Sequence, residues 1–464
     1  MPFTYHPPTR EHCHVCEQLA NVQRIPIIDS QNGKASSASN FPFHNWYYFV
    51  LGYSPQFPDY IIDKYNVTKD WFVVDPFMGT GTTLVSCKAK GIASGGVDAN
   101  DFFVDVAKAK LNWACDTKTL KEIRDDLFQK IENRYSLFSF NGIRKLPREQ
   151  QLTLFELQSK YAGNVQDYAN AYRMKMLDPR YISDKPFVKW HIIKDLIDEM
   201  VKKADSKAFY DLAIASILVP ISNVRYGPGF GVIKPKDDID VYSIFQNKVN
   251  QMIFDLDTVD DLQKNTSSII HKGDSREIEK YFEPNSVDLM VTSPPYPGDH
   301  EYTKHTRLEL IAMGYAQNLD DFRVIKKRMI RGSTTNIYNN DNNRQHVEHI
   351  QSIREVTDLI DERLRADGAT SGFEKLYTKL VWEYFGGMSL TFKSALNSLK
   401  PGGTFHLLVS DSHAFKMVHI QTANILADIS LDAGYSDVHI ELWQDKVSTS
   451  HKYNIKENII TLVK

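Results

Sequence analysis

The chain contains little of what would mark a secreted or membrane protein. Its 464 residues include only four cysteines, too few for a disulfide framework, which favours a reducing setting. No apolar run approaches the roughly 20 residues that a membrane helix needs. The first ten residues contain no apolar core of a secretory signal. We therefore expect a cytoplasmic protein with no membrane partner.

The chain also lacks a strong charge of either sign. A net charge of −3 gives no global indication of nucleic-acid binding, so a polyanionic partner would need a local basic surface. The composition, 42% hydrophobic and 24% charged, is typical of a globular protein. The length allows two or three domains, or one large α/β domain with insertions.

A metal site is only weakly indicated. Cys13 and Cys16 are spaced as Cys-x-x-Cys within the cluster 11–16, beside two histidines that would suit a tetrahedral zinc. No second cysteine pair follows, because Cys87 and Cys115 fall separately in expected helices. Ordinary thiols are therefore the favoured interpretation, and we expect no metal.

A glycine-rich turn follows a short apolar strand expected at 71–74. The turn reads Asp-Pro-Phe-Met-Gly-Thr-Gly-Thr-Thr over residues 75–83, and a helical pattern over 84–90 comes next. Gly79 and Gly81 allow the backbone to approach a ligand, and the helix N-terminus offers unbonded N–H groups. The turn has neither the end of a P-loop nor a clean dinucleotide-binding pattern. It predicts a nucleotide-type binding loop of another class.

Acids follow two further expected strands. The strand at 93–97 leads into Asp98, the position at which a Rossmann-like site binds ribose hydroxyls. The alternative for Asp98 is a helix N-cap for the segment 101–111. The strand at 267–270 is followed by Asp274, which we expect to accept a hydrogen bond from an adenine amino group.

The stretch 291–298 reads Val-Thr-Ser-Pro-Pro-Tyr-Pro-Gly and follows an apolar run at 286–290. Its first two prolines cannot continue a strand ladder, and they hold the preceding residues extended, so a stiff corner is expected at the strand end. The hydroxyl of Ser293, the nearby carbonyls and the ring of Tyr296 suit a planar ring that bears an amino group. An ordinary loop or a polyproline ligand is the alternative for the stretch taken alone.

The other regions differ in character. Residues 1–40 are expected to form a polar extension, and 101–265 a largely helical insertion that includes a glycine-rich loop at 222–230. The stretch 291–298 and the glycine-rich turn would belong to one domain formed by 41–100 and 266–464.

Two further patterns lie in the C-terminal third. The basic run 323–331 suits phosphate contacts, with a solvated helix face as the alternative. Helices are expected at 374–399 and 420–432, and strands at 438–443 and 457–463 would form a closing hairpin.

Together, the segments 75–83 and 292–296 resemble the paired signatures of S-adenosylmethionine-dependent DNA amino-methyltransferases. These enzymes methylate N4 of cytosine or N6 of adenine, usually as the modification half of a restriction–modification system. The resemblance spans 41–100 and 269–464. It implies that target recognition falls in the helical insertion 101–265, in the loop after Tyr296, or in both. It implies an α/β, Rossmann-like methyltransferase fold with a mostly parallel sheet, a large helical insertion and a closing antiparallel strand.

The resemblance also assigns roles to individual residues. The catalytic residues it implies are Ser293, Pro294, Pro295 and Tyr296. The cofactor-binding residues it implies are Asp75, Phe77, Gly79, Gly81, Thr82, Asp98 and Asp274. The aromatic segment 45–53 is a poor match to the additional cofactor-binding helix of the family, and a core role is its alternative.

The implied reaction is site-specific methylation of double-stranded DNA, with a cognate restriction endonuclease as functional partner. Serine at position 293, where many N6-adenine enzymes have aspartate, favours N4 of cytosine over N6 of adenine. A methyltransferase acting on RNA or protein remains an alternative, and so does a catalytically silent DNA-binding subunit.

Overall fold

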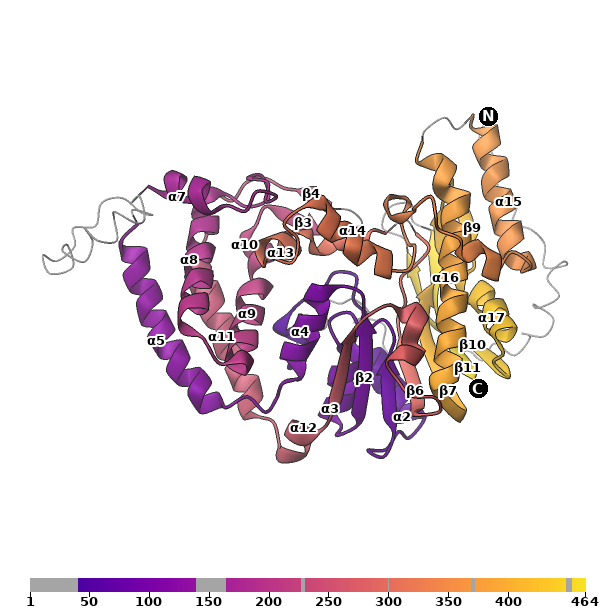
Figure 1. Cartoon of the computed structure of the whole chain (residues 1–464), viewed down its shortest axis with the longest axis horizontal. Coiled ribbons are helices and arrows are strands. Elements are labelled where there is room, and N and C mark those ends of the chain that lie inside the picture. Colours follow the sequence, from indigo (N-terminus) through magenta and orange to yellow (C-terminus); the bar gives the residue numbers. More distant parts are fainter. Residues whose placement is uncertain (1–40, 139–163, 227–229, 299, 369–371, 448–452) are drawn as a thin grey trace, which may run out of the picture. The chain divides into compact units, whose positions relative to one another are not determined.

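The structure, a computed structural model, describes most of the chain (Figure 1). The described residues are 41–138, 164–226, 230–298, 300–368, 372–447 and 453–464. They fall into two compact units, one formed by the described residues up to Asp274 together with 301–329, the other by 275–300 and 330–464. The expected extension 1–40, with its Cys-x-x-Cys cluster, lies outside the described residues.

Three parallel strands form the sheet of the first unit. They are β1 (Phe72–Asp75), β2 (Ala93–Asp98) and β5 (Ser268–Lys272), in the order β1-β2-β5. The helices α3 (Thr82–Ala89) and α4 (Asp101–Leu111) follow the first two strands. The predicted strand–turn–helix sequence around the glycine turn is therefore confirmed, with β1 one residue later than expected.

The segment between β2 and β5 is helical, as predicted. After α4, its helices are α5 (Thr117–Ser136), α7 (Val165–Tyr172), α8 (Asp184–Met200), α9 (Ala204–Ser216), α10 (Leu218–Ile221), α11 (Val241–Asp257) and α12 (Asp261–Asn265). Among the described residues of this segment, one short hairpin joins β3 (Val224–Tyr226) to β4 (Phe230–Val232). Helices α5, α8, α9 and α11 pack side by side (Figure 1). Their facing sides bury large apolar residues that form one continuous core with residues of α3 and α4.

The aromatic segment before β1 belongs to this core. It contains the short turn η4 (His44–Trp46), which precedes helix α2 (Gln56–Lys64). Trp46 is fully buried, packs edge-on against Phe209 of α9, and donates from Nε1 to Asp255 Oδ2 of α11 at 2.8 Å. The helical insertion and the aromatic segment are thus held together by both apolar and polar contacts. The unit is completed by η6 (Tyr302–Thr306), α13 (Arg307–Ala312) and α14 (Leu319–Arg328).

Four strands form the sheet of the second unit, in the order β10-β11-β7-β6. Strand β6 (Val287–Thr292) pairs in parallel with β7 (Leu399–Ser410), whereas β11 (Asn454–Val463) is antiparallel to both β7 and β10 (Asp437–Val447). The closing antiparallel hairpin is therefore confirmed. Its strands are longer than predicted, because charged residues alternate with apolar ones at their outer ends.

Three helices pack in this second unit. Helix α16 (Tyr377–Ser398) packs against both α15 (Gln351–Ala366) and α17 (Thr422–Ala433) (Figure 1). Gly434, at φ 107°, ends α17 as predicted. The smaller elements are η5 (Ser275–Lys280), η7 (Thr334–Asn336), η8 (Asn343–His346), η9 (Glu374–Leu376), β8 (Ser412–Ala414) and β9 (Val418–Ile420). The predicted α/β fold with mostly parallel strands, a helical insertion and antiparallel closing strands is confirmed.

Gly386 of α16 provides a direct test of packing in this unit. A Cβ atom at this position would lie 2.1 Å from the backbone oxygen of Asn343, so Gly386→Ala is expected to reduce the free energy of unfolding by about 2 kcal/mol. The matched control is Gly387→Ala, whose Cβ would meet the flexible end of the Ile330 side chain first, at 3.0 Å, and no backbone atom within 4 Å among its three nearest contacts. Urea unfolding should show the first variant destabilised and the second near wild type; equal stability would contradict the close approach.

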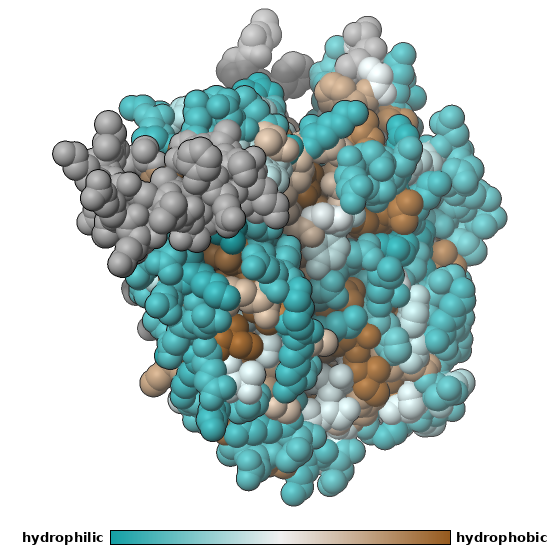
Figure 2. Space-filling model, turned by 60° about the vertical axis from the view of Figure 1, so that its left-hand side comes forward, coloured by the Kyte–Doolittle hydropathy of each residue, from teal (hydrophilic) through white to brown (hydrophobic). Residues whose placement is uncertain are grey.

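The surface carries the polar character that the composition suggests. The face seen in Figure 2 is mostly hydrophilic, with hydrophobic residues scattered over it. Within the described ranges, no helix combines the length and the apolar character needed to span a bilayer.

Candidate cofactor and amino-group sites

The glycine turn is fixed by a buried carboxylate. Asp75 is completely inaccessible; its Oδ1 accepts from the N–H of Phe77 at 3.0 Å, and its Oδ2 accepts from the Tyr53 hydroxyl at 2.7 Å. The same hydroxyl lies 2.6 Å from Thr83 Oγ1. Asp75 therefore fixes the start of the turn, and Tyr53 connects it to the helix that follows.

Both glycines of the turn adopt left-handed conformations that other residues rarely take. At Gly79, φ is +51°, and an added Cβ atom would meet nothing within 4 Å, so its backbone faces open space. At Gly81, φ is +85°, and an added Cβ atom would lie 3.3 Å from Cβ of Ala107. Gly79 therefore leaves room for a ligand, whereas Gly81 allows α3 to begin close to α4.

Asp98 lies at the end of β2 and holds the turn from the other side. Its Oδ2 accepts from Gly79 N–H at 2.9 Å and its Oδ1 from Asn100 N–H at 2.7 Å. Burial raises the pKa of this carboxyl to about 7. The helix N-cap is Asn100, whose side chain accepts from Phe102 N–H at 3.1 Å. The N-cap alternative for Asp98 is therefore wrong, and each of its oxygens keeps a second lone pair for a ligand.

Asp274 lies close to the end of β2, because its neighbour Gly273 is hydrogen-bonded to Asp98. Gly273 donates its N–H to the backbone carbonyl of Asp98 at 2.9 Å. Asp274 itself is half-buried and follows β5 directly after this turn. The acids predicted after β2 and β5 thus lie at adjacent carboxyl ends of parallel strands, where α/β sheets bind ligands.

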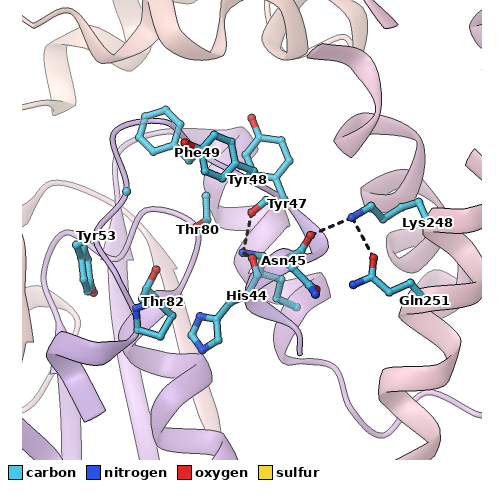
Figure 3. A pocket seen from close by; sticks show the side chains of 13 residues that line it. His44, Asn45, Tyr47, Tyr48, Phe49, Tyr53, Thr80, Thr82, Lys248 and Gln251 are labelled. Carbon is cyan, nitrogen blue, oxygen red and sulfur yellow. Dashed lines mark hydrogen bonds between the residues drawn. The ribbon is translucent and has the colours of Figure 1, made fainter. Parts of the chain in front are cut away.

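A cavity of about 340 Å³ opens against the glycine turn (Figure 3). Thr80 and Thr82 of the turn line it, and Lys248 and Gln251 of α11 line it from the insertion. Its other walls come from His44, Asn45, Tyr47, Tyr48, Phe49, Gly52, Tyr53, Pro55 and Lys110. The volume is within the range of small-molecule sites. The aromatic segment thus lines a cavity in addition to its core role.

Sequence reasoning did not find the cavity residues that come from helices. Lys110 lies on α4, and Lys248 and Gln251 lie on α11. Each is a single polar residue in an ordinary amphipathic helix, so no local pattern distinguishes it. Only the packing of α11 against the aromatic segment places these side chains at the cavity.

A buried carboxyl group supports the cavity wall. Glu309 of α13, which is 1% exposed, accepts from the hydroxyl of Tyr47 at 2.8 Å and from that of Tyr226 at 3.1 Å. Burial raises the pKa of Glu309 to about 7, and it raises the pKa of both tyrosines above the usual range. The network joins a cavity residue to the glycine-rich loop, of which residues 227–229 lie outside the described residues.

This network predicts a pH-dependent stability. Because the folded pKa of Glu309 lies above the unfolded value of 4.5, its contribution is complete below pH 4.5 and is lost as the pH rises through about 7. The stability of wild type relative to Glu309→Gln should therefore fall over this window by up to about 3 kcal/mol. Urea unfolding at several pH values measures the difference. The exposed Glu122→Gln is the control, and an equal pH profile in both variants would contradict the prediction.

The Ser-Pro-Pro-Tyr corner lies in the second unit, at the end of β6. The hydroxyl of Ser293 donates to the carbonyl of Leu408 at 3.0 Å, and its oxygen lies 3.3 Å from the Tyr296 hydroxyl. Tyr384 of α16 donates its hydroxyl to the carbonyl of Pro295 at 2.7 Å. The predicted corner after the strand is present, and β7 and α16 both hold it in place.

Two acceptors remain at the corner. The hydrogen of the Ser293 hydroxyl is directed to Leu408, so its oxygen can accept from a further donor. Among the residues that the structure describes, no donor contacts the carbonyl of Pro294, whereas the carbonyl of Pro295 is taken by Tyr384. Tyr296 is half-buried, which leaves part of it accessible for a contact.

The basic run has partners that its sequence does not show. Arg323 pairs with Asp320 of its own helix at the surface, and three further residues pair with acids from other segments: Lys326 with Glu301, Arg328 with Asp101, and Arg331 with Asp341. These pairs balance charges that the sequence suggested for phosphate contacts, and so favour a structural role for the run. In the part of the chain that the structure describes, no group of His, Cys, Asp or Glu is placed to hold a metal ion.

The α/β fold with its mostly parallel strands is consistent with a Rossmann-like methyltransferase fold. Comparison with known proteins agrees. The chain is similar to three curated Type II methyltransferases: M.MjaII of Methanocaldococcus jannaschii (25% identity, 53% of this chain and 58% of the relative), M.BsoBI of Geobacillus stearothermophilus (21%, 70% and 61%) and M.MvaI of Kocuria varians (24%, 49% and 47%).

The chain spans about half to three-fifths of the length of these relatives. No family model and no solved structure matches it. The resemblance predicted from the two motifs is confirmed at this level: the chain is a homologue of Type II methyltransferases.

Proposed function

We propose that the protein is a site-specific DNA methyltransferase that transfers a methyl group from S-adenosylmethionine to the exocyclic amino group of a flipped base. The observation that carries the proposal is the corner after β6, where Ser293 and Pro294 present acceptors beside Tyr296. The names of the relatives add support, since each is a Type II methyltransferase. N4 of cytosine is the favoured target, and N6 of adenine is the second candidate.

The residues of the first unit fit such a cofactor. The open space at Gly79, the cavity beside Thr80 and Thr82, and the lone pairs of Asp98 offer room and acceptors. Asp98 would accept from the ribose hydroxyls, and Asp274 would contact the adenine. Phe77, Gly81 and the buried Asp75 would shape the turn. S-adenosylmethionine would supply the methyl group from its sulfonium.

The corner would activate the target amino group. An exocyclic amino nitrogen is a poor nucleophile, because its lone pair is delocalised into the ring. Acceptance of its hydrogens by Ser293 Oγ and the Pro294 carbonyl would draw them out of the ring plane and localise the lone pair. The rest of the catalysis is positioning and electrostatic stabilisation. Pro295, held by Tyr384, would keep the acceptors in place.

The base must leave the duplex to reach this corner. Unstacking costs a few kcal/mol, which stacking on Tyr296 would partly offset. Double-stranded DNA is therefore the proposed substrate, with a cognate restriction endonuclease as functional partner in the cytoplasm. Methylation of RNA or protein is the alternative that shares this chemistry.

Base-resolved sequencing of DNA methylated by the protein tests the proposal. DNA from a methylation-free host that expresses the chain should contain N4-methylcytosine in one sequence context. N6-methyladenine in one context would support the second target. Labelling of RNA or protein alone, or DNA binding without methylation, would contradict the proposed function.

A further inference from the structure

Two lysines from distant parts of the chain, Lys110 and Lys248, line the cavity beside the glycine turn, and Figure 3 shows the second of them. Lys110 of α4 is 2% exposed and donates to the carbonyls of His44 at 3.1 Å and Tyr47 at 3.2 Å. Lys248 of α11 donates to the carbonyl of Asn45 at 2.9 Å. Both ammonium groups therefore bind carbonyls of the same short turn, one from α4 and the other from α11.

Asp255 of α11 acts electrostatically on Lys248 without pairing with it directly. Within the described ranges, neither ammonium group forms an ion pair, since their acceptors are backbone carbonyls and the amide of Gln251. The half-buried Lys326, by contrast, pairs with Glu301 at 3.1 Å. Burial lowers the pKa of Lys110 to about 7, and it also lowers the pKa of Lys248. One buried and one half-buried cation at the same cavity would both be stabilised by an anion.

The cavity also has groups that can accept hydrogen bonds, in addition to the lysine donors. Gln251 and Asn45 supply amide groups, and Thr80 and Thr82 supply hydroxyls from the turn itself. A ligand with a carboxylate and an adjacent ammonium would find donors at the lysines and acceptors at the amides and carbonyls. No acidic side chain is among the residues that line the cavity.

We propose that Lys110 and Lys248 bind the carboxylate of the amino-acid part of the cofactor, so that the helical insertion forms one wall of the cofactor site. The inference rests on the proposed function, because it assumes that S-adenosylmethionine binds at the turn 75–83. It gives α11 a role in cofactor binding that is separate from target recognition. Asp255, also on α11, supports this role by holding Trp46 of the same turn.

Isothermal titration of the full chain with three nucleosides tests the proposal. S-adenosylhomocysteine has the carboxylate, decarboxylated S-adenosylmethionine lacks it, and 5′-methylthioadenosine lacks the amino-acid part. Lys248→Met is expected to weaken the binding of S-adenosylhomocysteine about tenfold or more and to leave the other two within about twofold. Lys248→Arg should recover part of the affinity. The exposed Lys130→Met, on α5 of the same insertion, is the matched control and should bind as wild type.

The alternative outcomes are distinct. Equal weakening for all three nucleosides would show that Lys248 only holds the turn, and would overturn the proposal, as would unchanged affinity for S-adenosylhomocysteine. Failure of the wild-type protein to bind any of the three would instead contradict the proposed function. Lys110→Met should show the same selectivity in protein whose thermal melting confirms folding.

Discussion

Replacing Tyr296 by alanine is expected to lower kcat/KM for DNA methylation about 1,000-fold. Stacking of a base on an aromatic ring contributes about 1–3 kcal/mol, and misplacement of a reacting group by about 1 Å costs about 100-fold. Both losses apply here, because the proposed acceptors at Ser293 and Pro294 work only on a base held in one plane. Initial rates of methyl transfer to a defined duplex measure the effect.

The matched control keeps the ring. Tyr296→Phe loses only the hydroxyl that lies 3.3 Å from Ser293 Oγ, and its rate should stay within about fivefold of wild type, since a weak hydrogen bond contributes about 1 kcal/mol or less. Cofactor affinity should be unchanged in both variants. A rate for Tyr296→Ala close to that of Tyr296→Phe would remove the ring from the proposed mechanism.

Replacing Asp98 by alanine is expected to weaken the binding of S-adenosylmethionine about 100- to 1,000-fold. The change removes the proposed acceptor of the ribose hydroxyls, and hydrogen bonds to a charged group contribute about 1.5–3 kcal/mol each. It also removes the acceptor of the Gly79 N–H at 2.9 Å, which loosens the turn. Titration calorimetry measures the affinity directly.

A second acid on the neighbouring helix provides the control. Asp105 is exposed on α4 and accepts from the Tyr315 hydroxyl at 2.7 Å, so Asp105→Ala should leave the cofactor affinity within about threefold. Burial raises the pKa of Asp98 to about 7, so the cofactor affinity should also depend on pH. Because hydroxyl donors prefer the ionised carboxylate, the affinity of the wild type should rise from pH 6 to pH 8. An affinity that is independent of pH in wild type, with Asp98→Ala unchanged, would refute the role of Asp98.

Much of the site was accessible from the sequence because its motifs are local. Glycines at positions 79 and 81 adopt positive φ, and the prolines of the corner end β6 as expected. These features follow from the conformational limits of single residues and their neighbours. The acids at or just after the ends of β1, β2 and β5 were likewise predicted. An apolar run in the sequence indicates each strand, and the acid that follows the run indicates its end.

The hydrogen-bond and ion-pair partners of the charged residues could not be predicted from the sequence. The sequence left Asp98 with an N-cap alternative, which the hydrogen bond of Asn100 excludes. It showed Arg328 and Arg331 without nearby acids, and the fold supplies Asp101 and Asp341. Such pairings join residues far apart in the chain or across turns, and no periodicity records them.

The sequence by itself predicted the similarity to methyltransferases, since the glycine turn and the Ser-Pro-Pro-Tyr corner each depend on short-range backbone chemistry. The tertiary structure alone decided that Asp75 is buried and shapes the turn, that Leu408 and Tyr384 hold the corner, and that Lys248 of the insertion reaches the cavity beside the glycine turn. The physical reason is that burial and long-range contacts depend on how whole elements pack, which a local pattern does not encode.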